Sequence, residues 1–260
     1  MAGQILRMPV TDRPRASTPE ALCMSDRARF GDPVAAWLWT ATADHRRAFY
    51  SLPALRSAIL AGVTRDCLRH LAGEMAALHR ELASVVGAMR QADDADARSL
   101  RGVARAIARD LARLEADLAW IGQPHASARS SAAGEATALL LSTFRQTGEV
   151  VGAGGLAATL SVCRATLSGL SRRLVLATQV RWQSCDPRGF GYWLALDAAI
   201  GGAGASRPPG AGPEQGVACR TRQAMLAQTK LVYAVTGLAF SHALAFHDLA
   251  GDPPRPAGRS

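Results

Sequence analysis

Three polar side chains, Asp66, His70 and Glu74, follow one another at intervals of four residues, which places them on one face of a helix. Carboxylates and an imidazole at that spacing can share a metal ion. Helical di-iron sites, however, use paired Glu-x-x-His segments that face one another, and the chain contains no Glu-x-x-His. We therefore keep the three residues as candidate metal ligands, expect them to form a solvated helix edge, and predict no bound metal or cofactor.

A second candidate is the stretch from Trp182 to Trp193, which holds four of the fourteen aromatic residues of the chain. Tryptophan, tyrosine and arginine dominate contact hot spots, so this stretch could line a ligand pocket or bind a partner. The alternative is a corner between helices that its aromatic residues fix to the core. The candidate ligand or partner contacts are Trp182, Cys185, Asp186, Arg188, Phe190, Tyr192 and Trp193.

The remaining chemical motifs are incomplete. The run from Asp93 to Asp96 is interrupted by Ala95 and has no second copy, so a polar turn with a helix cap explains it. The glycine-rich run 152–155 follows no predicted strand and precedes no Gly-Lys-Ser/Thr, unlike a phosphate-binding loop. Neither Gly-x-Ser-x-Gly nor His-Glu-x-x-His occurs. We therefore predict no catalytic residues.

Two long apolar stripes are the clearest structural signal. In residues 53–91 and again in residues 94–121, apolar side chains recur every three or four positions, as on one face of an amphipathic helix. Four arginines spaced four apart, from Arg101 to Arg113, lie on the opposite face of the second stripe. Because only a short aspartate-rich link separates the stripes, we predict an antiparallel helical hairpin over residues 53–121.

Further helices are predicted over 33–49, 129–146, 156–182, 186–200 and 217–249, which makes seven in all. The glycine-rich residues 148–155 lie between the fourth and the fifth of them. The last of these helices is apolar around most of its circumference, so we expect it to pack inside. Alternating strand patterns are absent. We predict an all-α antiparallel bundle of about five to seven helices in a single domain, 32–249. A loose N-terminal arm (1–31) with a short helix, a flexible loop (201–216) and a disordered tail (250–260) complete the chain.

The chain is basic, with 30 Lys and Arg against 21 Asp and Glu and a net charge of +9. Nearly all the cations are arginine, Lys230 being the only lysine, and they are spread along the chain instead of forming one basic tract. Nucleic-acid-binding modules concentrate such charge on one face or tail. A nucleic-acid partner is therefore kept as an alternative that only the net charge supports.

The five cysteines are far apart and include no Cys-x-x-Cys pair, which is typical neither of a disulfide framework nor of a zinc site. The N-terminal residues have no apolar core of the signal-peptide kind. The most apolar long run, 224–246, contains Gln228, Lys230 and His242, which would be costly in hydrocarbon. We expect a cytoplasmic protein without a membrane span.

Regular heptad-like stripes without a catalytic constellation are typical of coiled-coil packing and of helical interaction proteins. The first functional expectation is therefore a non-enzymatic interaction or regulatory protein that contacts a protein partner or forms a homo-oligomer. The alternatives are a basic nucleic-acid-associated regulator, and a helical-bundle enzyme or small-molecule binder with a pocket near residues 182–193.

Overall fold

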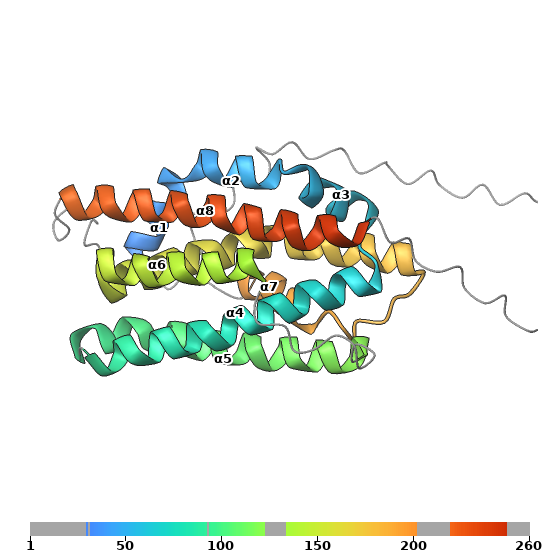
Figure 1. Ribbon diagram of the computed structural model, residues 1–260, viewed down its shortest axis with the longest axis horizontal. Coiled ribbons are helices and arrows are strands. Elements are labelled where there is room, and N and C mark those ends of the chain that lie inside the picture. Colours follow the sequence, from blue (N-terminus) through green and yellow to red (C-terminus); the bar gives the residue numbers. More distant parts are fainter. Residues whose placement is uncertain (1–29, 31, 93, 123–133, 202–218, 249–260) are drawn as a thin grey trace, which may run out of the picture.

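A computed structural model describes residues 30, 32–92, 94–122, 134–201 and 219–248. Within these residues the chain forms eight helices and no strand, which confirms the predicted all-α bundle (Figure 1). The helices are α1 (Pro33–Ala41), α2 (Ala43–Tyr50), α3 (Pro53–Ala61), α4 (Arg65–Ala92), α5 (Asp94–Ile121), α6 (Glu135–Trp182), α7 (Gly191–Gly201) and α8 (Cys219–Asp248). The predicted arm, loop and tail lie outside the described residues, apart from Phe30 and Gly201.

Helices α4 and α5 form the predicted antiparallel hairpin and lie side by side (Figure 1). Their apolar stripes face the core, where Leu71 and Val86 of α4 and Leu100 and Leu114 of α5 are almost fully buried. On α5 the arginines at 101, 105 and 109 are exposed, as the sequence predicted, whereas the fourth, Arg113, is only partly exposed and contacts Asp110. The hairpin begins at Arg65, however, and not at the predicted position 53.

Gly62 breaks the predicted continuous helix over 53–91, so that prediction is wrong at residues 62–64. Its φ is 72°, and a Cβ atom at this position would lie 2.5 Å from the carbonyl oxygen of Ala177. Only glycine combines a positive φ with such a close approach to another backbone. Thr64 then starts α4, since its hydroxyl accepts a hydrogen bond from the Cys67 amide at 3.1 Å and caps the helix.

Helix α6 reverses direction at Gly152, where φ is 72° and ψ is −179°. Thr147 and Thr159 are twelve residues apart and would be separated by about 18 Å along a straight helix. Their hydroxyls instead contact adjacent residues of α8, Gln228 at 3.4 Å and Thr229 at 3.1 Å. The helix is therefore bent back on itself around α8.

The two halves of α6 are called here the first arm (135–151) and the second arm (153–182), and Figure 1 shows them in yellow-green and yellow. They correspond to the two helices predicted from sequence, with a shorter link between them. Glycines allow the close approach at the bend: a Cβ atom at Gly148 would lie 2.9 Å from Met89 Sδ, and one at Gly155 would lie 2.4 Å from Val151 Cγ2.

Helix α6 is the centre of the bundle, because it packs against α1, α3, α4, α5, α7 and α8. The prediction that α8 lies inside is wrong: Ala227, Leu231, Ala234 and Leu238 form an exposed stripe along it.

Among the described helices, only α6 is long and apolar enough to cross a membrane by composition. Its most apolar window has a mean hydropathy of 1.4, and 56% of that window is buried in the bundle. Core helices of bundles pass the same test.

The short helices also differ from the prediction. The predicted helix over 33–49 divides at Thr42 into α1 and α2. The helix predicted to start at Asp186 starts at Gly191, because the carboxylate of Asp117 on α5 accepts hydrogen bonds from the Gly191 and Tyr192 amides at 2.7 Å and 2.9 Å. A carboxylate in this position satisfies otherwise unpaired amides at a helix start.

Candidate functional site

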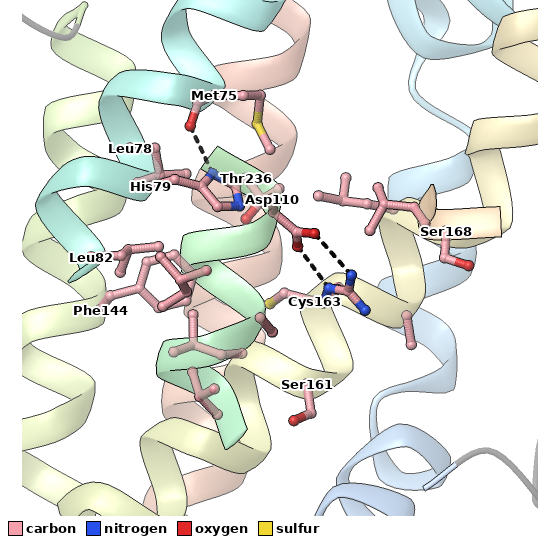
Figure 2. Close-up of a pocket in the computed structure, with 18 of the residues that line it drawn as sticks. Met75, Leu78, His79, Leu82, Asp110, Phe144, Ser161, Cys163, Ser168 and Thr236 are labelled. Carbon is pink, nitrogen blue, oxygen red and sulfur yellow. Dashed lines mark hydrogen bonds and ion pairs between the residues drawn. The ribbon is translucent and has the colours of Figure 1, made fainter. Parts of the chain in front are cut away.

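A cavity of about 340 Å³ lies in the core between α4, α5, both arms of α6 and α8, with α7 at one side (Figure 2). This volume falls within the range of small-molecule sites. Most of its wall is apolar and includes Leu78, Leu82, Ile107, Leu140, Phe144 and Leu167. The cavity opens to solvent near Asp32 and Gly102, which line it and are exposed.

An ion pair between a buried carboxylate and a half-buried guanidinium forms the charged part of the wall. Asp110 of α5 is only 2% exposed. The guanidinium group of Arg164, on the second arm, donates to both of its carboxylate oxygens, from Nε at 2.9 Å and from a terminal nitrogen at 3.1 Å. Arg113 adds a longer contact at 3.3 Å. Such a fork-to-fork pair fixes the orientation of the arginine, so Arg164 presents its remaining N–H groups in a defined direction.

His79 of α4 lies on the same wall, with its ring on the Asp110 and Thr236 side of α4 (Figure 2). It is 8% exposed, and burial lowers its pKa, so the imidazole is neutral near pH 7. Its Nδ1 lies 2.7 Å from the carbonyl oxygen of Met75, which identifies Nδ1 as the protonated nitrogen. The Nε2 atom is then an acceptor available to a ligand.

Tyr192 of α7 packs edge-on against His79, with ring centroids 5.7 Å apart. Burial, reinforced by the charge of Asp110, raises the pKa of Tyr192 well above its usual value, so the phenol stays protonated. Within the described part of the chain its hydroxyl makes no hydrogen bond. Cys163 is also in the wall, and burial raises the pKa of its thiol to about 12, which makes it a poor nucleophile.

Two further hydroxyls line the cavity without a hydrogen-bond partner among the described residues: Ser168 on the second arm and Thr236 on α8. They are 4% and 7% exposed. A buried polar group without a partner costs about 1–3 kcal/mol, and most buried polar groups in proteins are satisfied. These two hydroxyls are the polar groups of the wall that a bound water or ligand would satisfy.

The aromatic residues of the predicted 182–193 site mostly serve the core. The Trp182 indole donates to the Val63 carbonyl at 2.8 Å and packs on Phe190 with ring centroids 5.3 Å apart. Trp193 is buried against Tyr192. Of the seven candidates, Tyr192 alone lines the cavity.

The polar members of that stretch lie at the surface. Asp186 and Arg188 form a hydrogen-bonded ion pair with each other at 2.7 Å, and the Arg188 guanidinium lies over the Trp120 ring. The Asp186 side chain is paired in this way, and the Arg188 hydrogen bonds lower its pKa. Cys185 is exposed. The structure thus separates these three residues from the cavity, and contact with a partner stays a prediction for them.

The three candidate metal ligands are not brought together either. Asp66 pairs with Arg69 one turn away. The Glu74 carboxylate accepts hydrogen bonds from the Gly134 amide at 2.9 Å and from the Thr137 hydroxyl. It is thus used to hold the start of α6. In the residues that the structure describes, no group of three or more His, Cys, Asp or Glu side chains is arranged to hold a metal ion.

Sequence reasoning missed His79, Asp110, Arg164, Ser168 and Thr236. A signal for two of them was present, because Asp110 falls between Ile107 and Leu114 on the apolar stripe of α5, and His79 falls beside Leu78 on that of α4. A charged or imidazole side chain at a core position is uncommon and needs a partner or a function.

Comparison with protein-family models, curated proteins and solved structures finds no match to this chain. The fold and the site define an all-α helical bundle whose core contains an amphipathic cavity.

Proposed function

We propose that this protein binds a small, mostly apolar molecule with a polar head group in the cavity between α4, α5, α6 and α8. The observation that carries the proposal is the pair of unpartnered hydroxyls, Ser168 and Thr236, in the wall of a cavity of about 340 Å³. Functional pockets combine an apolar lining with a few convergent polar groups, and the ion pair of Asp110 with Arg164 adds a charged one.

Packing energetics support this use of the cavity. Protein cores are close-packed, with few voids larger than a water molecule. Water can enter at the open side, and a ligand with an apolar body gains affinity by displacing such poorly ordered water.

A cavity-filling variant tests the proposal. Ala106 of α5 lines the cavity, whereas Ala108, two residues away, is exposed and does not. We expect saturable binding of the fluorescent probe anilinonaphthalene sulfonate to the wild-type protein and to Ala108→Phe, and at least tenfold weaker binding to Ala106→Phe. Native mass spectrometry should show the same pattern for any molecule retained on purification. Equal binding by the two variants would contradict the proposal.

The exposed stripe of α8 favours a second candidate, self-association. Leu231 and Leu238 are 41% and 55% exposed, and Ala227 and Ala234 complete a spacing of four, three and four residues. This spacing matches the seam of paired helices. A second copy could place its own α8 against the stripe around a twofold axis. Light scattering at rising concentration should show a dimer that Leu231→Glu weakens and Leu139→Glu, on an exposed face of α6, does not. A monomer at every concentration would exclude this candidate.

A further inference from the structure

The ionic cluster at one side of the cavity has a net positive charge. The Asp110 carboxylate pairs with Arg164, which lines the cavity, and with Arg113, which lies outside the lining and is partly exposed; two positive charges with one negative charge leave +1. Among the described residues, the other acid in the wall is Asp32, whose exposed carboxylate accepts a hydrogen bond from the α1 backbone at 2.9 Å. Water screens an exposed charge much more than a buried one. Only Asp110 is buried in the cluster, while Arg164 and Arg113 are 33% and 41% exposed and are screened in part. One negative charge on a ligand would neutralise the cluster.

Hydrogen-bond donors outnumber acceptors at the same place. Arg164 has five N–H groups, of which two are directed at Asp110, and within the described structure no contact is seen for the other three. The Tyr192 hydroxyl is a further donor, and the hydroxyls of Ser168 and Thr236 can act in either sense. The acceptor side chains in this part of the described wall are His79 Nε2 and the Asp110 carboxylate, which already accepts three N–H bonds from arginine. A head group rich in acceptor atoms fits this set.

We propose that the ligand is a monocarboxylate with an apolar body, held by its carboxylate at Arg164 and Tyr192. The inference rests on the proposed function and names the chemical class that the same cavity selects. An arginine guanidinium matches the planar geometry of a carboxylate. The apolar body would lie against the leucines and phenylalanine of α4 and the first arm, which form the uncharged wall (Figure 2).

The alternatives fit the wall less well. A cationic ligand would meet a net positive charge that is partly removed from water, where repulsion is strong. A neutral alcohol would use the hydroxyls but leave the Arg164 donors without an anionic acceptor, and hydrogen bonds to a charged group are about twice as strong as neutral ones. A dianion would leave an excess negative charge beside Asp110. One charge on the wall thus favours one charge on the ligand.

The experiment compares three molecules with the same chain, octanoate, octanol and octylamine, by isothermal titration calorimetry on the full chain. Octanoate should bind at least tenfold more tightly than either of the others. Arg164→Met should weaken octanoate binding about ten- to a hundredfold, the loss expected for charge-assisted hydrogen bonds, and change octanol binding less than threefold. The matched control is Arg172→Met, an exposed arginine of the same arm that does not line the cavity.

Because Arg164→Met leaves Asp110 with Arg113 alone, it could fail to fold. The second variant, Tyr192→Phe, removes a hydroxyl that has no protein partner, and it should weaken octanoate binding about three- to tenfold. Octanol, which brings no charge to that hydroxyl, should lose less than threefold. Preference for octanol or octylamine, with binding lost in Ala106→Phe, would overturn the carboxylate assignment and leave the proposed function standing. Octanoate binding that neither variant weakens would overturn the assignment as well. No binding of any of the three at millimolar concentration would overturn both.

Discussion

Replacing Thr236 by valine should stabilise the unliganded protein, which is the opposite of what a polar-to-apolar change does at a satisfied site. The Thr236 hydroxyl is buried and has no partner in the described structure. Valine has nearly the same shape, so the change removes a desolvation cost of about 1–3 kcal/mol without leaving a void. We expect the free energy of unfolding to rise by about 1–2 kcal/mol.

Thr229 provides the matched control, because it is also buried on α8, seven residues earlier. Its hydroxyl hydrogen-bonds the Thr159 hydroxyl at 3.1 Å and donates to the Met225 carbonyl at 2.8 Å. Thr229→Val leaves the buried Thr159 hydroxyl without this partner, and it should lower the free energy of unfolding by about 1–2 kcal/mol.

Urea unfolding followed by circular dichroism measures both effects, and the two variants should differ by about 2–4 kcal/mol. In a thermal melt each kcal/mol corresponds to roughly 2–4 °C in a domain of this size. If Thr236→Val is destabilised as much as Thr229→Val, the Thr236 hydroxyl has a partner in the unliganded protein. The cavity wall would then not lack a polar contact at Thr236.

Two further predictions concern His79 in the same wall and the break at Gly62 before α4. Burial lowers the pKa of His79 from 6.5, so below about pH 6.5 the unfolded chain binds more protons than the folded chain. The free energy of unfolding should therefore fall as the pH falls through that window, by up to about 1.4 kcal/mol per pH unit. In urea titrations at several pH values, His79→Gln should flatten this slope. Gly62→Ala should cost more than about 3 kcal/mol, because it combines a φ of 72° with a Cβ atom 2.5 Å from the Ala177 oxygen. Gly73→Ala, in α4 with no atom near the added Cβ, should raise the free energy of unfolding by up to about 1 kcal/mol. Similar stabilities for the two alanine variants would contradict the requirement for glycine at position 62.

The hairpin of α4 and α5 could be predicted from sequence because its apolar stripes follow the helical period within each segment. The break at Gly62 could not. A glycine in a helical pattern has only a modest cost, and the need for glycine there comes from the backbone of Ala177, more than a hundred residues later. Likewise, the predicted helix start at Asp186 was wrong, because Asp117, on another helix, caps α7 at Gly191.

The cavity could not be predicted because its chemistry belongs to pairs of residues that are distant in sequence. Asp110 and Arg164 are 54 positions apart and sit on different helices. The hydroxyl of Thr236 differs from that of Thr229 only in what surrounds it. Sequence patterns report which face of a helix is buried, whereas an unmet hydrogen bond or an unfilled volume is a property of the assembled core.

The bend at Gly152 has a consequence for how the chain acquires its structure. It brings the two arms of α6 into contact near the bend, and α4 and α5 are joined by a single residue, so both helix pairs close with very short loops. Chains dominated by such local contacts fold fast, because little loop entropy is lost before contacts form. The cavity, in contrast, lies between these two hairpins and α8, and its wall is complete only when all three have docked. A molecule bound in this cavity would therefore stabilise the docked arrangement of both hairpins with α8.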